Sequence, residues 1–177
     1  MRMVQSFLNV GKGYSAMKKF CMLMNMDLLP SRTFNIYKKK LCKSLVRSTV
    51  KSLNDVRSQG KSAYQSNSAI TDIDVTFDGT WLTRGHSSQI GVGCVIDLLT
   101  GFVMDFEIMS KRCIECEHAK SGLGENSAEF HVWYEGHISS CAINHVGSSC
   151  AMEQEAALKL WQRYEDSGFR YDTIVRW

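Results

Sequence analysis

The period of the apolar positions changes once along the chain, near residue 70. Before that point apolar residues recur every three or four positions, which predicts one helix over residues 13–26 and a second over about 34–57. Pro30 ends the first helix, and Ser31 or Thr33 can cap the second. Beyond residue 70 apolar and polar residues alternate, as expected for β-strands with one buried face. The pattern therefore predicts a helical front followed by a mixed body.

Three alternating runs open that body, over residues 73–77, 90–98 and 102–108. Their connections are short, which predicts an antiparallel meander. A helix from about Cys150 to Asp166 follows, capped by Ser148 or Ser149, and a fourth strand begins at Tyr171. The order β-β-β-α-β is the opening of the ribonuclease H-like fold. We therefore expect an α+β or α/β protein whose N-terminal basic helices precede an incomplete fold of this kind.

These patterns divide the 177 residues into three parts. We expect a basic helical region over 1–61, a polar linker over 62–69 and the partial ribonuclease H-like domain over 70–177, with a Cys/His-rich irregular insertion at 110–147. The first ten residues make a poor signal peptide, and no run of apolar residues is long enough to span a membrane. The sequence therefore predicts a soluble intracellular protein without a membrane partner.

Charge is distributed unevenly between these parts. Residues 1–61 hold 13 Lys and Arg against two Asp, a net charge of +11, whereas residues 62–177 hold eight against 16 acids, a net charge of −8. The second helix carries much of the positive charge, on Lys38, Lys39, Lys40, Lys43, Arg47 and Lys51. Such a helix can bind the phosphates of DNA. It can equally be a solvated surface or bind another protein, and the charge alone leaves these alternatives open.

Asp78 is the acidic residue whose position most suggests chemistry. It ends the first predicted strand and precedes Gly79, which lets a substrate backbone approach closely. In a ribonuclease H-like fold an acid at this place, with one from the end of the fourth strand, holds paired divalent ions for phosphoryl transfer. Asp-Gly is also a common turn, which is the plainer interpretation. Glu153 is a weaker candidate, because in the first turn of its helix it also suits the helix dipole.

Four Cys and His residues have the spacing of a zinc site. Cys113 and Cys116 form a C-x2-C pair, and His137 and Cys141 form a second pair after twenty residues. Two tight pairs separated by a loop can converge on a tetrahedral Zn²⁺, and a site closed by four protein ligands is structural. His118, His145 and Cys150 are competing ligands nearby. The alternative is a loop that carries reduced surface cysteines.

Several of these segments resemble Mutator-like transposase domains. The stretch from Asp74 to Ser88, DVTFDGTWLTRGHSS, is similar to the family's first-strand signature. GSSCAME, from Gly147 to Glu153, is similar to its motif at the start of the following helix. The Cys/His spacing looks like the family's insertion, and GKGY at Gly11 to Tyr14 looks like its N-terminal extension. The resemblance covers essentially the whole chain.

The resemblance implies that Asp78 is the first acid of a DDE triad that uses Mg²⁺ or Mn²⁺. The second acid would follow the strand that begins at Tyr171, and the third would lie further on, so this chain is expected to be an inactive N-terminal fragment. Asp172 stands at the wrong end of that strand to replace the second acid. DNA is the implied partner and the nucleus the implied location, with homo-oligomerisation left open. The alternative function is a domesticated zinc-containing module that binds DNA or protein without catalysis.

Overall fold

The computed structural model describes residues 1–83 and 87–175. The chain forms two compact units, Met1–Asn54 and Asp55–Trp177, and the division falls inside the long helix α3 (Ser31–Ala63). That helix is longer at both ends than the sequence pattern predicted. No helix in the described part of the chain has the length and apolar composition needed to cross a membrane.

The N-terminal unit is built from three helices. α1 (Arg2–Asn9), which the sequence pattern did not predict, and α2 (Tyr14–Leu23) are joined by a turn in which Gly11 has φ +69°. Both helices pack against the first turns of α3 through a small apolar core. That core consists of Val4, Met17, Cys21, Phe34 and Leu41. The two helices predicted for this region are thus confirmed as α2 and α3, with shifted boundaries.

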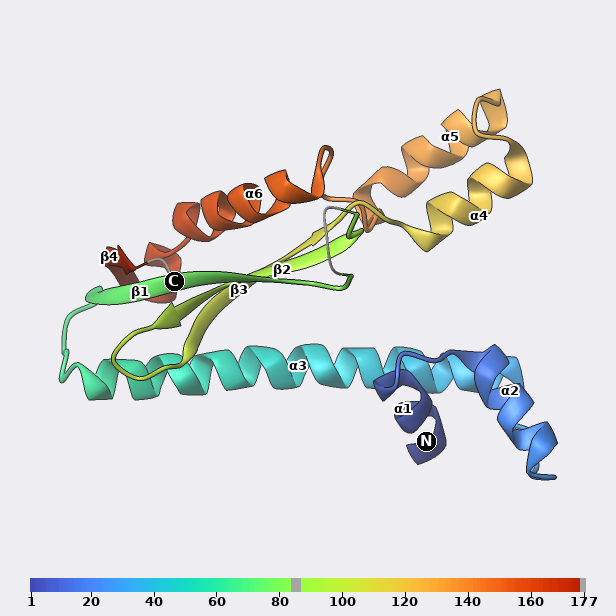
Figure 1. The fold of residues 1–177 in the computed structure, drawn as a ribbon, viewed down its shortest axis with the longest axis horizontal. Coiled ribbons are helices and arrows are strands. Elements are labelled where there is room, and N and C mark those ends of the chain that lie inside the picture. The colour runs from blue at the N-terminus through green and yellow to red at the C-terminus, as the bar shows by residue number, and fades with distance from the viewer. Residues whose placement is uncertain (84–86, 176–177) are drawn as a thin grey trace. The chain divides into compact units, whose positions relative to one another are not determined.

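The C-terminal unit is organised around a four-stranded mixed sheet in the order β3-β2-β1-β4. The strands are β1 (Thr71–Trp81), β2 (Ile90–Asp97), β3 (Val103–Ser110) and β4 (Phe169–Val175). The first three form the predicted antiparallel meander, and β4 runs parallel to β1. Figure 1 shows α6 (Ser149–Gln162) lying along one face of the sheet, as the crossover between β3 and β4.

Alternate sheet positions build the core under α6. Phe77 and Trp81 on β1 pack towards this helix, and Gly93 on β2 lies directly beneath it. A Cβ atom at Gly93 would lie 2.9 Å from both the Ala156 Cβ and the Phe77 ring, so only glycine permits this approach of helix to sheet. The main core cluster consists of Ile73, Val75, Val95, Met104, Leu160, Phe169 and Tyr171.

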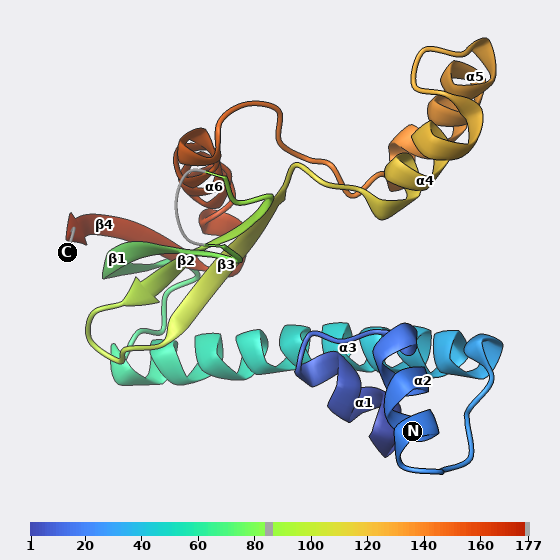
Figure 2. The ribbon, with the colours of Figure 1, turned by 45° about the vertical axis from the view of Figure 1, so that its right-hand side comes forward.

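The segment predicted to be irregular, 110–147, is largely helical, and that prediction was wrong. It contains α4 (Ile114–Leu123), α5 (Ala128–His137) and the 3₁₀ turn η1 (Ile138–Ser140). Figure 2 shows α4 and α5 as a hairpin that extends away from the sheet. The Ser127 hydroxyl caps α5 by accepting a hydrogen bond of 3.0 Å from the Phe130 N–H. Each helix buries few residues, Cys116 on α4 and Phe130 and His137 on α5, so no continuous apolar stripe marks either one.

Three further boundaries differ from the sequence prediction. β1 continues past Asp78 to Trp81, because β2 pairs with it along its full C-terminal half, as far as Gly91 opposite Trp81. The last helix ends at Gln162 and is followed by the short turn η2 (Glu165–Ser167) and Gly168 at φ +80°. β4 consequently begins at Phe169, two residues before the predicted start.

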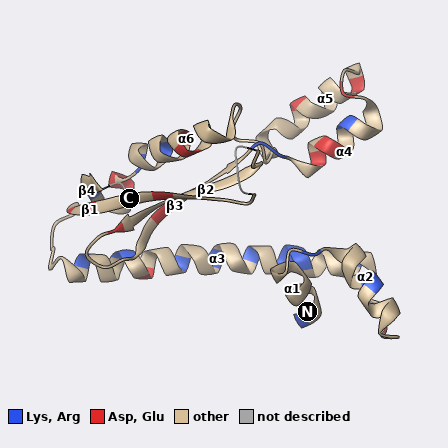
Figure 3. Cartoon of the chain, in the orientation of Figure 1, with Lys and Arg blue, Asp and Glu red and all other residues tan. Residues whose placement is uncertain are grey.

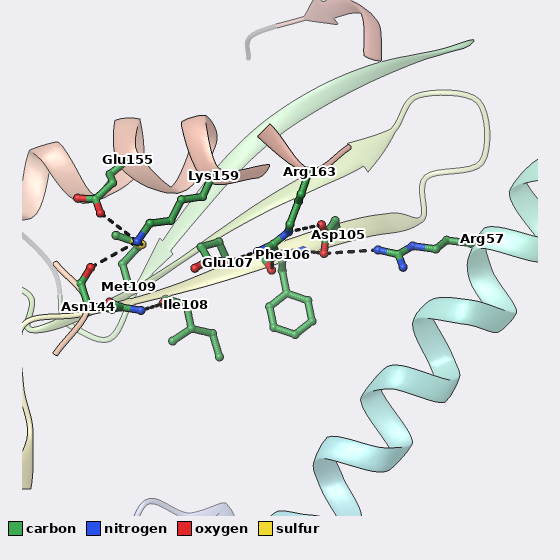
Figure 4. Close-up of polar contacts among 10 residues, drawn as sticks. All are labelled: Arg57, Asp105, Phe106, Glu107, Ile108, Met109, Asn144, Glu155, Lys159 and Arg163. Carbon is green, nitrogen blue, oxygen red and sulfur yellow. Dashed lines mark hydrogen bonds and ion pairs between the residues drawn. The ribbon is translucent and has the colours of Figure 1, made fainter. Parts of the chain in front are cut away.

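The outer edge of β3 is covered by side chains, as Figure 4 shows. Arg57 donates to the Met104 carbonyl at 3.2 Å, Arg163 to the Phe106 carbonyl at 2.8 Å, and Asn144 to the Ile108 carbonyl at 2.7 Å. The Arg163 guanidinium also binds Asp105 at 2.9 Å and Glu107 at 2.5 Å. This edge is thus closed to pairing with another strand.

Replacing Arg163 with Ala is expected to lower the free energy of unfolding by about 2–4 kcal/mol. The substitution removes this cation from two carboxylates that are mostly buried, Asp105 (9% exposed) and Glu107 (18% exposed). The Arg163 side chain itself is 38% exposed, so the loss is smaller than for a fully buried ion pair. Urea unfolding measures the difference. Arg170→Ala is the matched control, since its ion pairs of 3.6 Å are exposed and should contribute about 0–1 kcal/mol. Equal losses in the two variants would contradict this role of Arg163.

Candidate metal centres and nucleic-acid interface

The structure brings the four predicted zinc ligands together. Cys113 and Cys116 lie at the start of α4, His137 ends α5, and Cys141 follows η1. One ligand atom from each of the four residues lies within 4.8 Å of all the others. The Cys113 Sγ and the His137 Nε2 are 3.3 Å apart, and the Cys116 Sγ and the Cys141 Sγ are 3.5 Å apart. The cluster forms the base of the α4–α5 hairpin.

The His137 ring is held in the orientation that a metal ligand requires. Its Nε2 faces the sulfur atoms, while its Nδ1 lies 3.3 Å from the Ser140 Oγ and 3.4 Å from a Glu115 carboxylate oxygen. A hydrogen bond on the second nitrogen is the usual way in which proteins orient a metal-binding histidine. The Trp133 ring stacks on the imidazole at a centroid distance of 4.6 Å. Sequence spacing identified the ligands but gave no sign of these supporting residues.

The thiols differ in their protonation. Burial raises the pKa of Cys113, but hydrogen bonds from the backbone N–H groups of Ala142 and Cys116, together with His137, outweigh burial and lower this pKa to about 6. Burial, aided by hydrogen bonds to Cys141 and Cys113, raises the pKa of Cys116 to about 12. The cluster therefore holds one thiolate readily, and a dication would favour ionisation of the others.

Three sulfur atoms and one imidazole nitrogen are a donor set that fits a tetrahedral structural zinc. The competing ligands lie elsewhere. His145 is buried, and its two ring nitrogens face a Glu155 carboxylate oxygen at 2.5 Å and the Ser148 carbonyl at 3.0 Å. His118 and Cys150 are exposed and lie outside the cluster. The geometry thus selects Cys113, Cys116, His137 and Cys141 from the candidates.

Asp78 is exposed on β1, within the strand rather than at its end. One of its carboxylate oxygens accepts a hydrogen bond of 2.8 Å from the Gly79 N–H. Cys94 stands opposite it on β2, with its thiol 3.4 Å from the Asp78 carbonyl oxygen. Burial and then the charge of Asp78 raise the pKa of Cys94, so this thiol stays protonated. Cys94 is only half-buried beside the candidate acid.

Glu153 lies over the residue next to Asp78. A Cβ atom at Gly79 would be 3.6 Å from the Glu153 Cγ. Glu153 also lines an open cavity of about 660 Å³ beside α6, whose other walls include Phe77, Trp161 and Val175. Asp172 lies in the part of β4 that pairs with β1 around Ile73 to Val75 and is therefore not beside Asp78.

The six basic residues of α3 predicted to bind DNA lie in the N-terminal unit and are all exposed. At about 100° per residue, Lys39, Lys40, Lys43, Arg47 and Lys51 fall within a sector of about 120°. This sector is opposite the face that buries Phe34 and Leu41. Lys38 lies about 100° around the axis from Lys39. Figure 3 shows the Lys and Arg residues along α3 and the acidic residues on the α4–α5 hairpin. We call the five aligned residues the basic stripe.

The chain was compared with protein families, with curated proteins and with solved structures. The family model of Mutator-like transposases matches residues 1–175. No curated protein and no solved structure gave a match. Residues 84–86 of the first-strand signature lie outside the described residues, whereas Asp78, α6 and the Cys/His cluster all lie within the match. Because the match spans both units, the chain belongs to the Mutator-like transposase family.

Proposed function

We propose that this chain is the N-terminal portion of a DNA transposase, with Asp78 as the first acid of a metal-dependent, ribonuclease H-like active site. The observation that carries the proposal is the position of Asp78 on β1, the strand between the antiparallel β2 and the parallel β4, which the chain reaches through α6. This arrangement supports a ribonuclease H-like core. The expected location of the protein is the nucleus, where its DNA substrate lies.

A single exposed carboxylate is too few ligands for the chemistry. Paired Mg²⁺ or Mn²⁺ ions, when bound, stabilise the attacking and leaving oxygens of a phosphoryl transfer. Asp78 would hold such an ion from β1, and the remaining acids would come from outside these 177 residues. Glu153 is retained as a minor contributor, since its side chain lies against Gly79. Alone, this chain is expected to bind DNA without cutting it.

The two edges of the sheet support the proposal that the remaining acids come from outside these 177 residues. The outer edge of β3 is covered by Arg57, Arg163 and Asn144. Among the described residues, no side chain forms a hydrogen bond to the backbone of β4, and Ile174 is 52% exposed. An uncovered edge readily pairs with a further strand. We therefore place the rest of the catalytic domain on the β4 side of the sheet.

The test is DNA cleavage by a protein that carries this chain together with the remaining acids. Asp78→Asn should reduce Mg²⁺-dependent cleavage about a thousandfold or more, because it removes a carboxylate that binds the metal. Asp74→Asn is the matched control, since this exposed residue lies four positions earlier on the same face of β1 and should keep near-normal activity. Full cleavage by Asp78→Asn would instead favour a binding module without catalysis.

We further propose that Cys113, Cys116, His137 and Cys141 bind a structural Zn²⁺. The convergence of these four ligand atoms and the support of His137 by Glu115 carry this proposal. The ion would supply a cross-link between the two ends of the α4–α5 hairpin. All four positions would be filled by protein ligands, which leaves no open position for a reacting water.

The basic stripe of α3 is proposed to contact DNA phosphates. The slope of log affinity against log salt concentration changes by about 0.9 for each phosphate contact. Replacing Lys43, Arg47 and Lys51 with Ala should therefore make this slope less steep by about 2.7. Fluorescence anisotropy with a DNA duplex at several salt concentrations measures this slope. Replacing Lys12, Lys18 and Lys19 removes the same charge from exposed positions outside the basic stripe. An equal change in slope for both variants would show that only net charge matters.

A further inference from the structure

The three thiols of the Cys/His cluster have different neighbours. Cys113 lies against His137, at 3.3 Å, whereas Cys116 lies against Cys141, at 3.5 Å between sulfur atoms. Cys113 is 4% exposed and Cys116 is 3% exposed, but Cys141 is only partly buried. Solvent therefore reaches the cluster from the side of Cys141. The sequence gives a different expectation, because Cys113 and Cys116 are the neighbours in the C-x2-C pair.

We propose that Cys116 and Cys141 are a specific oxidation site that a peroxide converts into a disulfide, with release of the bound zinc. The inference rests on the proposed zinc site for the release of metal, but the choice of sulfur pair rests only on the geometry of the cluster. Cys113 is the less favoured partner because its sulfur lies 3.3 Å from the His137 Nε2, whereas the Cys116 and Cys141 sulfur atoms lie 3.5 Å apart.

The chemistry needs hydrogen peroxide as oxidant and two thiols as reductant. The Cys141 sulfur, the more accessible of the two, attacks one peroxide oxygen; the O–O bond breaks, one water leaves and Cys141 becomes a sulfenic acid. The Cys116 sulfur then attacks the Cys141 sulfur, the S–O bond breaks and a second water leaves. In the zinc-bound state both sulfurs are thiolates, so two protons from solvent complete the two waters, and two electrons pass from sulfur to oxygen. Only Cys113 and His137 would remain as ligands for a bound Zn²⁺, too few to hold it.

The proposed disulfide has a structural consequence. Cys116 lies in the first turn of α4 and Cys141 directly follows η1, 25 positions later. A bond between them closes the same loop that the metal closes, so it constrains the unfolded hairpin in a similar way. We therefore expect the oxidised, metal-free chain to keep α4 and α5, whereas the reduced, metal-free chain loses them. Oxidation would exchange one cross-link for another rather than unfold the hairpin.

The experiment treats the zinc-loaded 177-residue chain with hydrogen peroxide, follows Zn²⁺ with a chromogenic chelator and maps disulfides by mass spectrometry. Cleavage after Glu115 and Glu117 separates Cys113 from Cys116, so the two possible partners are resolved. The expected product joins Cys116 to Cys141, with one Zn²⁺ released per disulfide. A Cys113–Cys116 disulfide, or sulfinic acids without any disulfide, would overturn the inference.

Variants separate this inference from the zinc proposal. Cys113→Ser should still form the Cys116–Cys141 disulfide, Cys141→Ser should not, and Cys42→Ser, at an exposed site outside the cluster, should behave as the parent. If the chain binds no zinc and yet forms the Cys116–Cys141 disulfide, the choice of sulfur pair is supported and only the zinc proposal is overturned. A chain that binds zinc yet joins Cys113 to Cys116 overturns only the inference.

Discussion

Chelation of the metal, or His137→Ala, is expected to unfold the α4–α5 hairpin while the four-stranded sheet stays folded. The hairpin has very little apolar core of its own. Apart from the ligands Cys113 and Cys116, Phe130 is its only buried apolar residue among those described. Burial of one large side chain contributes about 1.5–3 kcal/mol, whereas a structural zinc contributes about 10 kcal/mol or more. A bound zinc would therefore be the main source of stability for this segment.

Hydrogen exchange with and without a chelator measures this loss directly. The amides of α4 and α5 should lose protection, while those of β1 and β2 should keep it. Trp133 provides an optical signal, because its ring stacks on the His137 imidazole at 4.6 Å. His131→Ala is the matched control, since this exposed histidine lies on α5 outside the cluster. Full protection of the hairpin in the presence of chelator would contradict the account.

Much of the fold followed from the sequence because the sheet obeys a simple alternation. Ile73, Val75 and Phe77 do face the core, and the order of strands and helix is the predicted one. The helices of the hairpin were missed for a physical reason. They are short, and few of their apolar residues are buried, so no continuous apolar stripe marks them. Sequence periodicity detects only helices that bury a continuous face.

The candidate sites could be predicted in part. Cys/His spacing was sufficient to predict the converging ligands, because two tight pairs can meet whatever the structure between them. The residues that orient His137 were not predictable, since Glu115 and Ser140 reach it only once α4 and α5 have formed. The end of β1 was misplaced because Asp78-Gly79 is typical of a turn, whereas the partner strand β2 keeps it extended.

Asp78→Cys is expected to abolish cleavage in Mg²⁺ and to restore it in Mn²⁺. A thiolate is a poor ligand for the hard Mg²⁺ ion and a better one for softer divalent ions. Loss of activity alone would also follow from misfolding, but rescue by a change of metal requires that residue 78 bind the ion. This variant thus separates a metal ligand from a residue that only stabilises β1.

The measurement that tests the central claim most directly is therefore the Mn²⁺/Mg²⁺ ratio of cleavage rates for Asp78→Cys. It is made in a protein that carries this chain and the remaining acids, with Asp74→Cys as the control at an exposed position on the same strand. The account predicts that the ratio rises by about a hundredfold or more for Asp78→Cys, as expected when a direct metal ligand is exchanged, and stays at the parent value for Asp74→Cys. Equal ratios in the two variants, or normal cleavage by Asp78→Cys in Mg²⁺, would contradict the assignment of Asp78 as a metal-binding acid.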